Sequence, residues 1–189
     1  MAALEELQNF NIKKLHEKLA LEDNEFEQWL EQLGLLHSRR TCPRCGGETF
    51  IRAIAGRRYG AWRCRAKNCR KETGYFVGTF FEGSKLSPKR VFELSYLWAR
   101  KYGTIDDVVQ ETGVSRATII DWFNFNRDVC AEFFVRNPIA IGGPGRFVEI
   151  DETLVVKRKY GVGRVLQKQD VWLFGGVERD SNWERVPAM

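Results

Sequence analysis

The chain has 189 residues, and its 43% hydrophobic content can build one or two ordinary domains or several small modules. No run of about 18 apolar residues occurs, so the sequence predicts no membrane-spanning helix and no membrane partner. The net charge of +5 is unevenly spread: residues 39–71 carry 11 Lys and Arg against one Glu, whereas residues 1–38 carry 3 against 8. A basic block interleaved with aromatic residues favours a polyanion such as DNA or RNA.

The N-terminal segment Met1–Leu7 contains Glu5 and Glu6 and lacks the apolar stretch of a secretory signal. We therefore expect an intracellular protein that is not secreted. It would be nuclear in a eukaryote, and in the cytoplasm or nucleoid in a bacterium. Cysteines in such compartments serve metals more often than disulfides.

Residues 1–38 are predicted to form an N-terminal helical segment. Leucine and isoleucine at near-helical spacing predict one helix over residues 4–19. A second helix is expected from the Asn24 and Glu27 capping pattern, and Gly34 suits the left-handed position after its end. The acidic helices are expected to pack on their neighbours, and a partner-binding face is the alternative.

Two close cysteine pairs, Cys42 with Cys45 and Cys64 with Cys69, are separated by 18 residues. This spacing is typical of a zinc ribbon, expected over residues 39–77. A hairpin of Thr49–Ala53 and Arg58–Arg63 would bring the pairs together around a structural Zn²⁺. Four unligated thiols are the alternative. Cys130, in an apolar helical context, is expected to be a buried small hydrophobic residue.

Residues 78–140 are predicted to be helical and to bind DNA. Ser87 before Pro88 starts one helix, Thr104 caps a short one, and Ser115 caps a third after a turn at Gly113. The order matches a helix-turn-helix, although generic three-helix packing gives the same pattern. The expected DNA contacts are Arg57, Arg58, Arg63, Arg65, Lys67 and Arg70 in the ribbon, with Arg116 and Thr118 in the third helix.

Residues 141–189 begin with a glycine-rich connector and continue with a strand, Phe147–Glu152. Its alternation places Glu149 and Asp151 on one face, where paired carboxylates need a cation or a basic neighbour. A divalent metal for phosphodiester chemistry is one interpretation, and a half-solvated edge strand is the other. Asp170–Val177 is expected to pair with this strand. The basic cluster Lys157–Tyr160 could neutralise the carboxylates, contact DNA or form a solvated hairpin tip.

Several blocks occur in an order that resembles the Merlin/IS1016-type DNA transposases, which carry an ISXO2-like transposase domain. They are Trp62-Arg63-Cys64 to Cys69, Gly78–Leu86, the helix-turn-helix, Gly142–Gly145, Val148–Glu152, Lys157–Tyr160 with Gly163-Arg164, and Trp172–Val177. The resemblance covers roughly residues 25–182. It implies a cut-and-paste transposase with an RNase H-like domain, in which three carboxylates hold two Mg²⁺ or Mn²⁺ ions.

Asp151 matches the first of those carboxylates, with Glu149 and Glu152 as weaker candidates. The match fades after Asn182, and no acid stands at the positions of the other two. We therefore expect an α+β, multi-module protein whose RNase H-like start is an incomplete β-hairpin, C-terminally truncated relative to the family. Mg²⁺ or Mn²⁺ is expected only with a complete catalytic domain.

The leading hypothesis is a transposase-derived DNA-binding protein without catalysis of its own, plausibly bound to transposon terminal inverted repeats. One alternative is a fragment or incomplete gene model of an active transposase. Another is an interaction module or inhibitor that pairs with itself or with a full-length relative. A remnant without function is the third.

Overall fold

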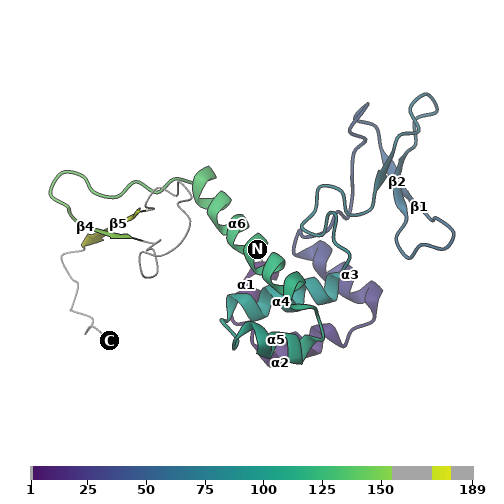
Figure 1. The fold of residues 1–189 in the computed structure, drawn as a ribbon. Helices are drawn as coiled ribbons and strands as arrows, with labels where there is room; N and C mark the ends of the chain where they lie inside the picture. The colour runs from purple at the N-terminus through teal and green to yellow at the C-terminus, as the bar shows by residue number, and fades with distance from the viewer. Residues whose placement is uncertain (1, 155–171, 180–189) are drawn as a thin grey trace, which may run out of the picture. The chain divides into compact units, whose positions relative to one another are not determined.

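The computed structural model describes residues 2–154 and 172–179 (Figure 1). Within them lie six helices and two small antiparallel sheets, which confirms the mixed α+β class expected from the sequence. The chain divides into two compact units, Met1–Val129 and Cys130–Met189. Across the described ranges, helices of the length and apolarity needed to cross a membrane are not found.

Three helices open the first unit: α1 (Ala2–Gln8), α2 (Ile12–Leu19) and α3 (Asp23–Gln32). The prediction of one helix over residues 4–19 was wrong, because Asn11 starts a second helix. Its backbone is extended and its side chain accepts the Lys14 N–H at 3.1 Å, as asparagine does at helix starts. The cap predicted at Asn24 was also wrong, since the helix is capped two residues earlier, where Glu22 and Glu25 exchange the capping bonds.

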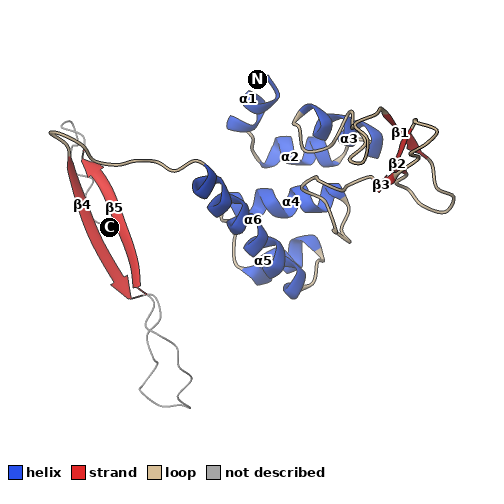
Figure 2. Cartoon of the chain, turned by 90° about the horizontal axis from the view of Figure 1, so that it is seen from above, coloured by secondary structure: helices blue, strands red, loops and turns tan. Residues whose placement is uncertain are grey.

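These helices close over the first apolar core together with α4 (Pro88–Ala99). Figure 2 shows α2 and α4 close together, in agreement with their contacts. Apolar positions at helical spacing supply this core, which is rich in aromatic rings. Its buried members are Phe10, Leu15, Phe26, Trp29, Leu30, Leu36, Phe81 and Val91.

A three-stranded antiparallel sheet lies between α3 and α4 in the sequence, formed by β1 (Thr49–Arg52), β2 (Ala61–Cys64) and β3 (Glu72–Gly74) in that order. The predicted hairpin is confirmed with shorter strands, whereas β3 was not expected. Gly60 is required where the hairpin closes, because a Cβ there would lie 2.3 Å from the backbone oxygen of Arg52.

The second core joins α4 to α5 (Ile105–Thr112) and α6 (Arg116–Arg136). The predicted caps at Ser87, Thr104 and Ser115 are confirmed, and Gly113 takes the left-handed conformation with φ +67°. The buried residues of this core are Leu94, Leu97, Val108, Val114 and Ile119.

Cys130 corrects a further prediction, because it is exposed rather than buried. Helix α6 continues past the core it helps to build, and after Asn126 the described helical residues are all exposed. Apolar neighbours such as Phe133 (60% exposed) therefore did not signal burial at this position.

The second unit contains an antiparallel hairpin of β4 (Phe147–Leu154) and β5 (Trp172–Arg179). Pairing of the two predicted strands is confirmed, with Asp151 opposite Gly175. The second strand starts at Trp172 within the described residues and extends two residues beyond the predicted Val177. The basic cluster Lys157–Tyr160 and the following Gly161, Gly163 and Arg164 lie outside the described residues.

Candidate metal centre

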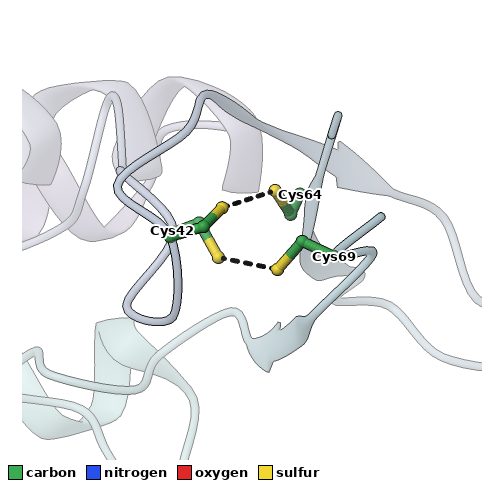
Figure 3. Close-up of side chains that lie close together, drawn as sticks. Cys42, Cys64 and Cys69 are labelled. Carbon is green, nitrogen blue, oxygen red and sulfur yellow. Dashed lines mark hydrogen bonds between the residues drawn. The ribbon is translucent and has the colours of Figure 1, made fainter. Parts of the chain in front are cut away.

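The four cysteines of the two sequence pairs converge beside the three-stranded sheet. Cys64 ends β2, and Cys42 follows Thr41, which forms an isolated bridge with Glu48. The four sulfur atoms all lie within 4.8 Å of one another. Cys42 Sγ lies 3.7 Å from Cys69 Sγ, and Cys45 Sγ lies 3.5 Å from Cys64 Sγ (Figure 3). The sequence prediction that these side chains come together is confirmed.

The sulfur spacing fits a tetrahedral metal site. Zinc–thiolate bonds are about 2.3 Å long, so the edges of a regular Zn–S₄ tetrahedron are about 3.8 Å. The two measured sulfur–sulfur distances are close to that edge. The cluster could therefore hold a metal ion such as zinc. Four thiolates complete the tetrahedral shell, which suits a structural ion rather than one that binds substrate.

Each cysteine pair lies in a tight turn of the backbone. The Gly46 N–H donates to the Cys42 carbonyl at 2.8 Å, and the Arg70 N–H donates to the Ala66 carbonyl at 3.1 Å. Gly46 (φ +69°) and Arg70 (φ +45°) both take the left-handed conformation just after the second cysteine of their pair. An arginine in that conformation costs about 1–2 kcal/mol, so the surrounding structure must hold it there.

Backbone N–H groups in these turns point at sulfur. Burial opposes ionisation of the Cys42 thiol, but hydrogen bonds from the Arg44 and Cys45 N–H groups outweigh it and lower its pKa to about 7. The Gly47 N–H favours the Cys45 thiolate, yet its thiol neighbours leave the pKa of Cys45 raised. The pKa of Cys69 is also raised, although the Lys71 N–H favours its thiolate. Several thiolates this close repel one another, and a bound cation removes that repulsion.

Gly47 was not singled out from the sequence, although it lies against the sulfur atoms. A Cβ built there would lie 3.4 Å from Cys45 Sγ and 3.7 Å from Cys64 Sγ. The Cys42 N–H also donates to the Gly47 carbonyl at 2.8 Å. The signal in the sequence was the pair of glycines directly after Cys45, which lets the turn lie close to the cluster.

Three of the predicted DNA-contacting arginines already have acidic partners. Arg58 pairs with Asp23 and Glu27 of α3. Asp23 also holds Lys89 of α4 at 3.0 Å, so one carboxylate links three segments of the first unit. Arg63 pairs with Glu72 at 3.2 Å, and Arg116 pairs with Asp106.

The other predicted basic contacts are exposed. Arg65 lies over the Phe50 ring, with the guanidinium carbon 5.2 Å from the ring centroid. Arg57, Lys67 and Arg70 form no ion pair within the described residues. Thr118 is half-buried, and its N–H and hydroxyl both contact the Ser115 hydroxyl that caps α6.

Asp151 is exposed on β4, and its Oδ1 accepts the Glu152 N–H at 2.9 Å. Glu149 pairs with Arg179 of β5, so a basic neighbour does face this carboxylate, as the alternation required. In the described part of the chain, the group of three or more metal-ligating side chains that lie close together is the cysteine cluster, and Asp151 does not belong to it. The catalytic assignment of Asp151 stays a prediction.

Comparison with known proteins yields one distant similarity. The chain is 26% identical over 142 residues to male abnormal protein mab-31 of Caenorhabditis elegans, and the match covers 67% of this chain. The chain spans about a third of the length of that curated relative, 33%. No protein-family profile matches the sequence, and no solved structure matches the fold.

Proposed function

We propose that this chain is a DNA-binding protein in which a zinc ribbon and a helix-turn-helix act together. The observation that carries the proposal is the basic segment 39–71, which contains 11 Lys and Arg and a single acidic residue, a Glu. The sheet and its four cysteines give this segment a fixed shape. Arg57, Lys67 and Arg70 project from it without acidic partners in the described residues, which suits contacts with phosphates.

Helices α5 and α6 support the second part of the proposal. A capping box at Thr104 starts α5, Gly113 turns the chain, and Ser115 starts α6, all packed on α4 through the second core. A helix-turn-helix protein reads base edges with the N-terminal part of its second helix. In α6 that part exposes Arg116, Ala117, Ile120, Asp121 and Asn124. Arg116 would exchange Asp106 for a phosphate or a base.

The resemblance to ISXO2-like transposases extends the proposal to the second unit. The β4–β5 hairpin would be the start of an RNase H-like domain, and Asp151 the first carboxylate for Mg²⁺ or Mn²⁺. We expect this chain to bind DNA, including transposon ends, in a nucleus or a bacterial nucleoid.

A gel shift with a mixed-sequence duplex at two salt concentrations tests DNA binding. The affinity should fall steeply with salt, because phosphate contacts release counterions. The double variant Arg57→Gln/Lys67→Gln should lower the salt slope by about 2. Lys13→Gln/Lys101→Gln removes the same charge from exposed sites outside the basic segment and should leave the slope unchanged. Binding that ignores salt, or equal losses in both variants, would refute the proposal.

A second candidate function, an interaction module, rests on the hairpin surface. Phe147 (78% exposed), Trp172 (58%) and Phe174 (68%) present apolar side chains on strands whose outer edges lack partners among the described residues. Exposed apolar strands favour pairing with another chain. Sedimentation of the purified protein, alone and with a full-length ISXO2-like transposase, would show a dimer or a mixed complex. A monomer in both mixtures would exclude this function.

A further inference from the structure

An open pocket of about 190 Å³ lies beside the start of α6 in the first unit. Three aromatic residues and two acidic residues line it: Phe80, Trp122, Phe125, Glu82 and Asp121. Phe80 and Glu82 come from the turn before α4, and the other three from α6. Neither the metal cluster nor the basic segment uses these residues, although Asp121 also lies in the part of α6 proposed to read base edges.

The three ring centroids lie close enough together for one cation to come within reach of all of them. Their centroids form a nearly equilateral triangle with sides of 5.8, 5.4 and 5.5 Å, and the Trp122 and Phe125 planes are 88° apart. A positive charge centred about 4 Å above this triangle would lie within about 6 Å of every centroid, the range of a cation–π contact. The electron-rich ring faces attract such a charge and tolerate its partial loss of water.

Glu82 and Asp121 add negative charge to the same lining. Glu82 is held by the Gly78 N–H, which donates to Oε2 at 2.7 Å and leaves Oε1 without a protein donor in the described residues. Within the described part of the chain, neither carboxylate forms an ion pair. Two carboxylates repel a phosphate group and attract a cation. The lining is therefore unsuited to the nucleic-acid backbone even though it lies on α6.

The size and the placement of the acids decide which cation fits. Pockets for drug-sized ligands are about 300–1,000 Å³, so this one suits a single side chain. The carboxylates come from two separate segments. An unmodified ammonium has N–H bonds in several directions and can donate to both, and a dimethylated one keeps one N–H for one carboxylate while its charge attracts the other, whereas a guanidinium donates in one plane. We propose that the pocket binds a lysine side chain of a partner protein, unmodified or methylated with at least one N–H retained.

Calorimetric titration of the full zinc-loaded chain tests the proposal. The probes are short acetylated peptides with one central lysine, dimethyl-lysine, trimethyl-lysine, arginine or norleucine. The lysine and dimethyl-lysine peptides should bind with a dissociation constant of about 1 mM or tighter. Trimethyl-lysine, which has no N–H, should bind at least about five-fold more weakly than dimethyl-lysine. Equal binding of norleucine, undiminished binding of trimethyl-lysine, stronger binding of arginine, or no binding at all would overturn the proposal.

Two variants and one control separate the pocket from general electrostatic attraction. Asp121→Asn and Phe125→Leu should each weaken dimethyl-lysine binding by about five- to ten-fold, because one removes a charge-assisted acceptor and the other a ring face. Both positions are exposed, and circular dichroism will verify that the variants fold. Glu111→Gln removes an exposed acid of α5 outside the pocket and should leave the affinity unchanged. An equal loss in the control would overturn the assignment. So would variants that weaken duplex binding instead of peptide binding, which would assign the pocket to DNA.

Discussion

Replacement of Cys64 by serine should remove the metal from the chain. Cys64 is 2% exposed, and its sulfur lies 3.5 Å from that of Cys45. A serine hydroxyl fills nearly the same space but is a poor ligand at neutral pH, since the thiolate is what binds soft metals. A structural zinc site supplies about 10–16 kcal/mol, or about 2.5–4 kcal/mol for each of four ligands. Loss of one ligand should therefore raise the dissociation constant for zinc by about 100- to 1,000-fold.

The sheet should lose its structure together with the metal. Apart from Cys42 and Cys64, its buried side chains in residues 39–77 are Ala61 and Trp62, which is a very small core. Trp62 Nε1 donates to the Tyr75 carbonyl at 3.2 Å, and the two rings stack. Without the metal, this indole should become solvent-exposed, because so little apolar surface is left to hold the strands together.

Native mass spectrometry and zinc competition with a chelator measure the first effect, and acrylamide quenching of tryptophan fluorescence measures the second. Cys130→Ser is the matched control, because that thiol is exposed and outside the cluster. It should bind one Zn²⁺ with unchanged affinity. A Cys64→Ser variant with wild-type zinc affinity, or a metal-free chain in which Trp62 stays protected, would refute the argument.

Three further predictions concern stability. Gly60→Ala should lower the free energy of unfolding by about 1–3 kcal/mol in urea titrations, because its Cβ would meet the Arg52 backbone; an unchanged midpoint would contradict the 2.3 Å approach. Arg58→Met should cost at most about 1 kcal/mol per lost ion pair at low salt and almost nothing at high salt, since the side chain is 47% exposed; a loss that persists in salt would contradict the ionic origin. Glu6 has a pKa below 4.5, mainly through its hydrogen bond with Lys18 and then that from Trp29, so its stabilising effect is present above pH 4.5 and is lost as pH falls through the lower folded-state value. With Glu6→Gln, the free energy of unfolding should therefore fall less steeply as the pH drops below 4.5. The same pH dependence in the variant and the wild type would contradict this assignment.

Three of the helix ends and the cysteine cluster could be predicted because local chemistry determines them. Ser87, Thr104 and Gly113 act within one turn of their own position in the chain, so their neighbours in sequence suffice. The cysteine pairs impose their own geometry, since four thiolates around one ion must converge. In each case, the residue types alone were enough to predict the feature, and no knowledge of the fold was needed.

The failed predictions have different causes: the break at Asn11 is local, whereas β3 and the exposure of Cys130 depend on the rest of the fold. A run of leucines spaced like a helix hid the break at Asn11, because periodicity does not show where a helix starts again. Strand β3 has only three residues, and it forms because β2 offers an edge to Glu72–Gly74. Cys130 is exposed because α6 extends beyond the core that it helps to build, and the amino-acid composition of the helix does not show how far it extends.

The ion pair between Asp23 and Arg58 limits how freely Arg58 can bind another anion. Arg58 cannot serve a phosphate group and the Asp23–Glu27 pair at the same time. Any polyanion that captures it must compete with two carboxylates tethered to the same chain, at a high effective concentration. Binding of Arg58 to an external polyanion therefore weakens the attachment of the sheet to α3. Substitution of Asp23 alone should free Arg58 in part and strengthen its binding to the polyanion.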